Sequence, residues 1–251
     1  MAGTNKKKKF LVSDPIIILK NPQLPENIGM VARTMANFGL RNLRIVKPKV
    51  NWPNKKSFSA SAGAFDIIEK YTKVYDNFDE AIKDIHFLCA TTVRKRDLNF
   101  KYATPKVAVR KMKINYYDKK IGFLFGGEKA GLSNNDISEA NLLITIPANK
   151  AFGSLNLGMA VNIIAYEWHI QNIKKRKSFF NKNIADKKNV NNFKKRVLNE
   201  LYNVKFFNNL EENATLVVNV KNIISKAALS DKEIKILHGI LTSLKNFKIN
   251  N

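Results

Sequence analysis

The stretch Ile121–Ser133 reads IGFLFGGEKAGLS, and it combines a strand, a glycine-rich turn and the start of a helix. Its first five residues form an apolar run, which is typical of a parallel strand covered on both faces. Gly126 and Gly127 end the run, and Ser133 with Asp136 has the pattern that begins helices. The glycines expose backbone groups to a ligand, although an ordinary strand–turn–helix junction has the same composition. The stretch therefore predicts a layered α/β domain and one candidate binding loop.

Strand-like and helix-like segments alternate in the same way over residues 10–172. This rhythm predicts an α/β fold with a mainly parallel sheet. The expected strands are Pro15–Lys20, Asn42–Val46, Thr72–Tyr75, His86–Thr91, Ile121–Phe125 and Leu142–Pro147. The expected helices are Ile28–Phe38, Phe58–Phe65, Phe78–Asp84, Lys106–Met112, Asn134–Glu139 and Ser154–Ile170. Because the last helix is apolar on nearly all sides, we expect it to be buried in the core and against a second copy of the chain.

The chain is strongly basic and contains a single cysteine. Its 251 residues carry 44 Lys and Arg against 20 Asp and Glu, a formal net charge of +24. Such a charge attracts polyanions, which favours nucleic acid as the partner over an anionic membrane surface or a charge kept only for solubility. No apolar run reaches the roughly 18 residues of a membrane span. We expect a cytoplasmic protein with no membrane partner and no metal, because one cysteine can form neither an intramolecular disulfide nor a multi-cysteine metal site.

Composition divides the chain into four parts. Residues 1–14 form a basic tail, and residues 15–172 form the α/β domain. Residues 173–196 contain ten basic residues and one acidic residue, which predicts an extended linker, a phosphate-binding arm or both. Residues 197–251 predict a small helical unit, in which Ser230–Glu233 is a capping box.

A second candidate site lies in Asn21–Gly39, which follows one expected strand and begins a helix. Asn27 is predicted to cap this helix, and Gly39 to end it. Arg33 points away from the apolar stripe and shares a face with Gly29, whose missing side chain lets a ligand approach beside the guanidinium. The alternative is an exposed helix arginine without a special role.

Polar residues also gather where other expected strands end, which is the edge at which open α/β sheets bind ligands. Thr91 and Thr92 follow one strand and precede Arg94 and Arg96, which reach phosphates or form only a basic surface loop. The long apolar helix contributes a serine that caps it or contacts a ligand and an asparagine whose amide needs polar partners, Ser154 and Asn156.

Other chemistries find little support in the sequence. Gly126 and Gly131 have the spacing of a phosphate loop, but Leu132 occupies the position of the required lysine, which excludes a P-loop NTPase. The patterns GxGxxG and GxSxG are absent, so neither a Rossmann dinucleotide site nor a serine hydrolase is predicted. The three histidines are scattered, and Cys89 lies in an apolar strand, where a buried inert thiol is expected.

Three motifs, in their order along the chain, make this sequence similar to the SpoU (TrmH-like) class of SPOUT RNA methyltransferases. That class has N-x-G-x-x-x-R, then F-G-G/x-E-x-x-G-L, then I-P followed by S-L-N-L-x-x-A-V. Here they are Asn27–Arg33, Phe125–Leu132, and Ile146–Pro147 followed by Ser154–Val161. The segments GSLNLGMAVNIIAYE and EIKILHGILTSL resemble the TrmJ-like branch of the class, which carries a small helical C-terminal extension.

The resemblance implies a SPOUT domain with a C-terminal trefoil knot, a homodimer packed through knot helices, and S-adenosylmethionine (SAM) as cofactor. The residues at the positions of the family's SAM contacts are Thr91, Thr92, Val93, Gly126, Gly127, Ile146, Ser154 and Leu155. The catalytic group on the RNA side would be Arg33, supported by Asn27, Glu128, Ser154 and Asn156. Gly153 is a departure, since TrmJ-like sequences carry a second serine there.

The resemblance also implies an activity, methyl transfer from SAM to the ribose 2′-oxygen of the cytidine or uridine at position 32 of the tRNA anticodon loop. The expected RNA-binding residues are Arg33, Arg94, Arg96, Lys174, Lys175 and Arg176. One alternative is a 2′-O-methyltransferase of this class that acts on another tRNA or rRNA site, and another is a basic RNA-binding protein without catalysis. The retained motif residues favour an enzyme, because RNA binding alone does not need them.

Overall fold

The computed structural model describes residues 15–93, 101–116, 118–173, 183–207 and 213–249. Its centre is a sheet in the order β3-β2-β1-β6-β4-β7-β5, in which every neighbouring pair of strands is parallel. The strands are β1 (Ile16–Lys20), β2 (Leu43–Val46), β3 (Thr72–Tyr75), β4 (Phe87–Thr91), β5 (Tyr102–Ala103), β6 (Ile121–Gly126) and β7 (Leu142–Ile144). This arrangement confirms the predicted α/β fold with a mainly parallel sheet.

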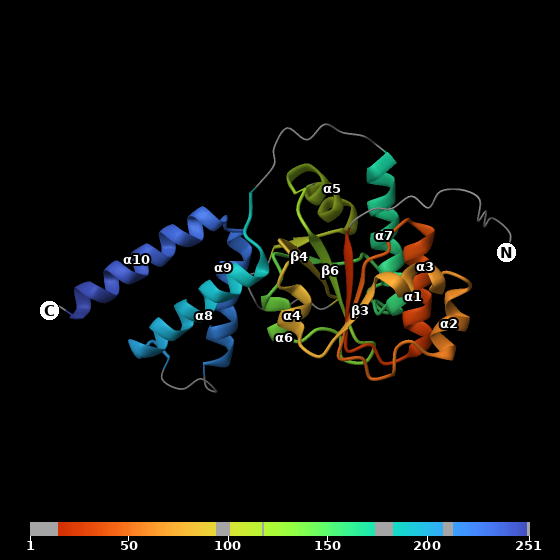
Figure 1. Ribbon diagram of the computed structural model, residues 1–251, viewed down its shortest axis with the longest axis horizontal. Helices are drawn as coiled ribbons and strands as arrows, with labels where there is room; N and C mark the ends of the chain where they lie inside the picture. The colour runs from red at the N-terminus through yellow and green to blue at the C-terminus, as the bar shows by residue number, and fades with distance from the viewer. Residues whose placement is uncertain (1–14, 94–100, 117, 174–182, 208–212, 250–251) are drawn as a thin grey trace.

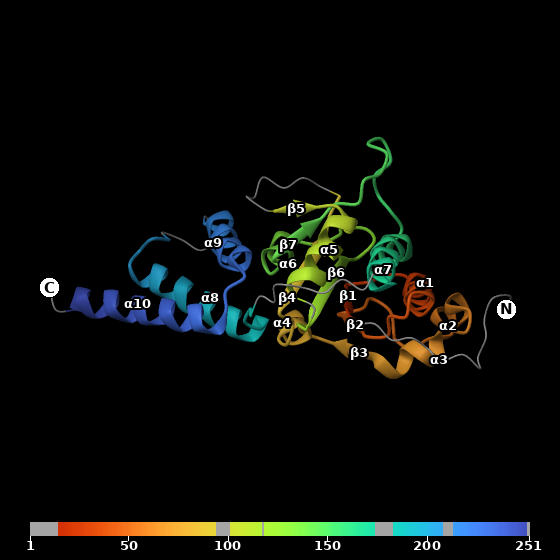
Figure 2. The same cartoon turned by 90° about the horizontal axis from the view of Figure 1, so that it is seen from above.

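Helices cover both faces of the sheet (Figures 1 and 2). The helices packed over one face are α1 (Pro25–Asn37), α5 (Pro105–Asn115) and α7 (Leu157–Ile173). Those on the other face are α4 (Phe78–Ile82) and α6 (Asn134–Ser138). Outside α1 lie α2 (Lys55–Ser61), α3 (Phe65–Ile68) and the 3-10 helix η1 (Glu69–Tyr71). Alternation along β1 serves both faces, since Ile17 and Leu19 enter one core and Ile16 and Ile18 the other.

The six expected strands are all present, and their ends differ from the prediction by at most three residues. The prediction missed β5, an edge strand of two residues that is too short to show a period. The single helix expected over Phe58–Phe65 is instead α2 and α3. Ala62 and Gly63 have positive φ angles of 49° and 83°, and this left-handed backbone ends α2.

Two helix starts also differ from the prediction. Asn27 is not the N-cap of α1, because the helix begins two residues earlier at Pro25, whose fixed φ suits the first helical position. The end of α1 is as predicted, with Gly39 at a φ of 74° just beyond it. The long apolar helix begins at Leu157 and not at Ser154, which leaves Ser154 and Asn156 in the segment that enters it.

The C-terminal helices begin earlier than the composition suggested. Residues 187–196, expected to belong to a basic linker, are the first part of α8 (Lys187–Asn203). Asp186 caps this helix by accepting a hydrogen bond from the Asn189 backbone N–H at 2.8 Å. Residues 174–182 lie outside the described part of the chain, so the linker remains a prediction there.

The helix α8 packs against α4 and α9 (Ala214–Ala227) against α6, and α10 (Asp231–Ile249) packs on α8 and extends away from the α/β domain, as Figure 1 shows. The predicted capping box begins α10, since Ser230 N–H donates to the Glu233 carboxylate at 2.7 Å and Glu233 N–H donates back to the Ser230 hydroxyl at 3.3 Å. Within α9, Ser225 donates through its hydroxyl to the Ser138 carbonyl at 2.7 Å. The hydrogen bond between Ser225 and Ser138 joins the unit to the α/β domain. None of the helices described here is both long and apolar enough to cross a membrane.

Candidate active site

The carboxyl ends of β4, β6 and β7 surround a cavity of about 280 Å³. This lies close to the lower end of the ~300–1,000 Å³ range of small-molecule sites, and it is at the edge where open α/β sheets bind ligands. All the residues expected to contact a cofactor line this cavity, namely Thr91, Thr92, Val93, Gly126, Gly127, Ile146, Ser154 and Leu155. The structure thus brings together positions that are more than 60 residues apart in the chain.

The turn after β6 is so tight that two positions require glycine. A Cβ on Gly126 would lie 2.2 Å from the backbone carbon of Gly131, and a Cβ on Gly127 would lie 2.4 Å from the Asn21 carbonyl oxygen. The backbone N–H of Gly131 donates to the Gly127 carbonyl at 2.8 Å and closes the turn. Because no side chain intervenes, the backbone of this turn forms part of the cavity wall.

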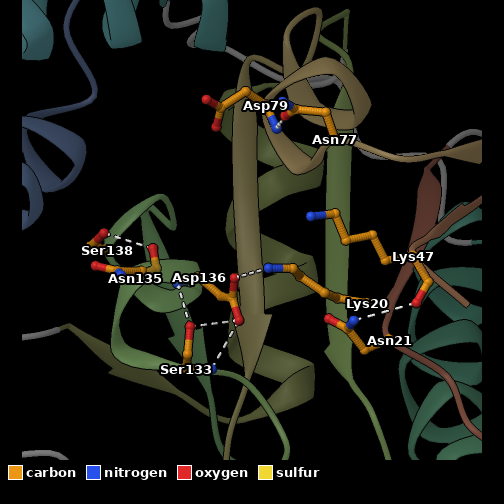
Figure 3. A network of polar contacts seen from close by, with 9 residues as sticks. All are labelled: Lys20, Asn21, Lys47, Asn77, Asp79, Ser133, Asn135, Asp136 and Ser138. Atoms are coloured by element: carbon orange, nitrogen blue, oxygen red, sulfur yellow. Dashed lines mark hydrogen bonds and ion pairs between the residues drawn. The ribbon is translucent and has the colours of Figure 1, made fainter. Parts of the chain in front are cut away.

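A polar network fixes the exit of the glycine turn (Figure 3). The Ser133 hydroxyl and N–H both donate to Asp136 Oδ2, at 2.8 and 2.9 Å, and Asp136 N–H donates back to the Ser133 hydroxyl at 3.2 Å. This is the predicted capping box of α6. The other carboxylate oxygen of Asp136 pairs with the ammonium group of Lys20 at the end of β1. The network therefore fastens the turn to the centre of the sheet.

Three of the predicted catalytic residues form one hydrogen-bonded chain. Asn27 donates through Nδ2 to Glu128 Oε1 at 2.7 Å, and Asn156 donates through Nδ2 to Asn27 Oδ1 at 2.8 Å. Asn27 belongs to α1, Glu128 to the glycine turn, and Asn156 to the segment that enters α7. The three sequence motifs therefore converge at one place beside the cavity.

The ends of this chain are satisfied by backbone groups. The Glu128 carboxylate accepts hydrogen bonds from the N–H groups of Gln23 at 2.8 Å and Leu24 at 3.2 Å, at the positive end of the α1 dipole. Asn156 Oδ1 accepts from the Gly158 N–H at 2.8 Å, so Asn156 caps α7. Glu128 and Asn156 thus position the helices, and Ser154, which is exposed and lines the cavity, is not needed as the cap.

Arg33 takes no part in these hydrogen bonds and does not line the cavity. It lies on α1 six residues beyond Asn27, about 9 Å further along the helix axis. Its side chain is exposed, and no residue in the described ranges forms a hydrogen bond or ion pair with it. The guanidinium is therefore available to a partner outside this chain.

The interpretation of Gly29 as an opening for a ligand beside Arg33 is wrong. A Cβ at Gly29 would lie 2.3 Å from the Ser57 carbonyl oxygen and 2.8 Å from the Ala60 Cβ, both in α2. The missing side chain admits a neighbouring helix of the same chain. Its function is close packing of α1 against α2.

The remaining predicted RNA-binding residues, Arg94, Arg96, Lys174, Lys175 and Arg176, lie outside the described residues. The prediction also missed part of the cavity lining, namely Phe125, Lys129, Ala130, Gly131, Leu132, Ile144, Gly153, Leu157 and Ala160. Leu157 and Ala160 are three residues apart and lie on one face of the helix, but this spacing identifies them as cavity residues only once the start of the helix is known. Lys129 and Ala130 occupy unconstrained motif positions, which give no signal.

The cysteine of β4, Cys89, does not line the cavity. Cys89 is fully buried, and burial raises the pKa of its thiol to about 12, as expected for an inert side chain. Among the residues that the structure describes, no three His, Cys, Asp or Glu side chains are grouped so that they could hold a metal ion.

Comparisons with known proteins give the same family as the three motifs. The profile of the SpoU rRNA Methylase family matches residues 14–166. An uncharacterized tRNA/rRNA methyltransferase of Haemophilus influenzae is 32% identical over 236 residues, covering 91% of this chain and 93% of the relative. The tRNA (cytidine/uridine-2′-O-)-methyltransferase TrmJ of Sodalis glossinidius is 31% identical over 233 residues, covering 92% and 91%. The crystal structure of TrmJ from Z. mobilis ZM4 superimposes with a TM-score of 0.83 at 35% identity, over 93% of this chain and 100% of that one.

Proposed function

Because the chain belongs to the SpoU rRNA methylase family, we propose that it methylates the ribose 2′-oxygen of tRNA with SAM, at the cytidine or uridine of anticodon-loop position 32. The observation that carries this proposal is the hydrogen-bonded series Glu128–Asn27–Asn156, which joins all three family motifs beside one cavity. The Sodalis relative, which matches over nine-tenths of both chains, is described as a tRNA cytidine/uridine 2′-O-methyltransferase, and this supports the choice of substrate.

The cavity fits the proposed cofactor chemically. Apolar side chains such as Ile146, Leu155 and Leu157 suit the faces of an adenine ring, and the bare backbone of the glycine turn suits its polar edges. Thr91, Thr92, Val93, Gly126, Gly127, Ile146, Ser154 and Leu155 would hold the cofactor. When bound, SAM supplies a methyl group that is already activated on a sulfonium centre. The protein has then mainly to align the RNA and assist its 2′-oxygen.

We assign that assistance to Arg33. A guanidinium is essentially never deprotonated in proteins, so Arg33 does not act as a general base, and the 2′-hydroxyl proton leaves to water, a phosphate oxygen or another side chain. As a fixed cation with a planar fork, it lowers the free energy of negative charge developing on the 2′-oxygen and positions the adjacent phosphate. Asn27, Glu128 and Asn156 are positioning residues that hold the segments around the cavity, and Ser154 contributes its hydroxyl at the cavity itself.

The proposal includes a homodimer and the trefoil knot of the family. Met30 on α1 is 36% exposed, and Met159 and Tyr166 on α7 are 56% and 49% exposed. The two helices adjoin here, since a Cβ at Gly158 would lie 3.0 Å from the Met30 Cβ. An exposed apolar surface across two packed helices is typical of a subunit interface. Such an interface also gives Arg33 a route to the cavity of the partner subunit.

Substrate binding is assigned to the net charge of +24, including Arg94, Arg96, Lys174, Lys175 and Arg176. We propose that the enzyme acts in the cytoplasm, where tRNA is matured. Because each phosphate contact releases counterions, tRNA affinity is expected to fall by at least tenfold between 50 and 200 mM salt while SAM affinity changes little. Filter binding and calorimetry over that range would measure the two affinities, and an equal salt dependence of both would contradict this assignment.

Replacing Gly126 by alanine is expected to weaken SAM binding by at least tenfold, because the new methyl group would lie 2.2 Å from the backbone of Gly131. The turn would have to open, and the cavity wall would move with it. Gly239→Ala is the matched control, since an added Cβ there meets no neighbouring atom within 4 Å and Gly239 lies on α10, away from the cavity lining. Calorimetry with SAM on both variants would measure the difference. Equal affinities would show that the turn does not shape the site.

Mapping ribose methylation in tRNA from cells with and without this gene would test the proposal directly. We expect loss of the 2′-O-methyl group at position 32, restored in vitro by the purified chain with SAM. A methyl group lost from another tRNA or rRNA position would favour another specificity, and the Haemophilus relative, described as a tRNA/rRNA methyltransferase, keeps both RNA classes open. Unchanged methylation together with no SAM binding in calorimetry would leave only a basic RNA-binding protein.

A further inference from the structure

The connection between β7 and α7 presents an aromatic ring beside the cavity. Ile146 and Gly153 of this connection line the cavity, and the turn Asn149–Phe152 stands between them. In Figure 2 the connection stands out from the body of the domain next to α7. The turn is ordered by two hydrogen bonds, from Phe152 N–H to the Asn149 carbonyl at 3.0 Å and from Ala151 N–H to Asn149 Oδ1 at 2.9 Å.

Phe152 is 81% exposed, more than any other large apolar side chain among the described residues. A single exposed apolar residue is ordinary, so exposure alone indicates nothing. The position is what is unusual. Val93, which lines the cavity and is 58% exposed, adjoins Phe152's neighbour, since a Cβ on Gly153 would lie 3.2 Å from Val93 Cγ1. The ring is therefore displayed from a turn whose flanks belong to the cavity wall.

Positive charge accompanies the ring. Lys150 lies in the same turn, and Lys129 lines the cavity from the glycine turn. Both side chains are exposed, and neither pairs with a carboxylate in the described ranges. An exposed aromatic ring flanked by unpaired cations is the composition of surfaces that bind unpaired nucleotides, whose bases stack and whose phosphates are attracted.

We propose that Phe152 stacks against the base of the nucleotide whose ribose is methylated, while Lys129 and Lys150 attract its flanking phosphates. This site rests on the proposed function, because a ribose presented at the mouth of the cavity places its own base on the rim. Stacking uses the face of the base and does not read its polar edges. The site therefore holds cytidine and uridine equally well, which suits an enzyme that accepts either pyrimidine.

The first test compares kcat/KM for RNA in the full-length chain and three variants, with tRNA whose methylated nucleotide has been mapped. Phe152→Ala is expected to lose at least fivefold, because stacking of one base contributes about five- to 150-fold. Phe152→Tyr keeps the ring and is expected to retain near-normal values. Phe58→Ala is the matched control, since Phe58 is 53% exposed on α2 and contacts Phe65, away from the cavity lining. SAM affinity is expected to be unchanged in all three.

A second measurement separates stacking from a structural role. RNA that lacks only the base of the target nucleotide is bound by the wild type and by Phe152→Ala, and the two affinities are compared. We expect them to be equal, because the ring then has nothing to stack on. The site would be overturned if the wild type still bound this RNA more tightly than Phe152→Ala. It would also be overturned if Phe152→Ala had an unchanged kcat/KM, or if that variant lost dimer mass or SAM affinity. A wild type that methylates no RNA would overturn the proposed function first.

Discussion

Arg33→Ala is expected to lose 10²- to 10³-fold in the rate of methyl transfer while SAM affinity and folding stay unchanged. This loss of rate is the one expected when a single preorganised group that stabilises developing negative charge is removed. We expect SAM affinity to be kept because the exposed Arg33 side chain forms no hydrogen bond or ion pair with a described residue and does not line the cavity of its own chain. Single-turnover transfer of labelled methyl to tRNA and calorimetry with SAM would measure the two quantities separately.

Two further variants sharpen the assignment of Arg33. Arg33→Lys keeps the charge but loses the planar fork, so it is expected to be nearly as slow as the alanine variant. Arg110→Ala removes one positive charge from an exposed position on α5 and controls for the general loss of attraction to RNA. Near-normal turnover by Arg33→Ala would remove the catalytic assignment, and loss of SAM binding would make Arg33 a structural residue.

Most of the sheet could be predicted from the sequence because most of its strands are apolar runs bounded by turns. The strand β6 is buried almost throughout, so Ile121–Phe125 shows an uninterrupted apolar signal. The two-residue strand β5 has no such signal, because it is held by pairing with β7 at the sheet edge. Local pattern therefore predicts elements with their own buried surface, and it misses those that depend on a neighbour.

The site could be predicted only in part, for the same reason. The sequence correctly required partners for the amide of Asn156, but it placed the residue inside the helix, where the structure uses it as the cap. Its partner Asn27 lies 129 residues away, and no local pattern encodes such a distance. Only the resemblance to the family indicated that Asn27 and Asn156 lie close together, since both belong to motifs that the family combines in one site. The same resemblance could not reveal that Gly29 packs against α2.

The basic run at residues 173–196 contains the buried face of a helix, which its high charge made difficult to predict. Lys187, Val190 and Lys194 are spaced three and four residues apart, which is one face of a helix, and all three are buried. The density of lysines suggested a solvated chain. In the structure Lys187 donates through Nζ to the Glu139 carbonyl at 2.6 Å, and Lys194 donates to the Glu139 carboxylate at 2.8 Å. The helix α8 is thus docked through the side-chain nitrogens of two buried lysines.

Lys194→Ala is expected to destabilise the protein by about 3–5 kcal/mol, because it leaves a buried carboxylate without its cation. The side chains of Lys194 and Glu139 are only 3% and 11% exposed. Burial alone would raise the pKa of Glu139, but the charge and hydrogen bond of Lys194 hold it below its ordinary value. In the variant that pKa rises, so Glu139 takes up a proton more readily. The loss of stability is therefore expected to be largest at pH 7 and above and to shrink toward pH 4.

Lys187→Met is the matched control for this experiment. Burial and the nearby charge of Lys194 lower the pKa of Lys187 to about 7, so at pH 8 most of its amine is neutral in the folded chain. Replacing it with an apolar side chain of similar length leaves the Lys194–Glu139 pair intact and removes only the donor to the Glu139 carbonyl, so we expect a loss of about 1–3 kcal/mol. Urea unfolding of both variants at pH 8 and pH 4 would measure the contrast. If Lys194→Ala cost no more than Lys187→Met at pH 8, the ion pair would not be what holds α8 against the α/β domain.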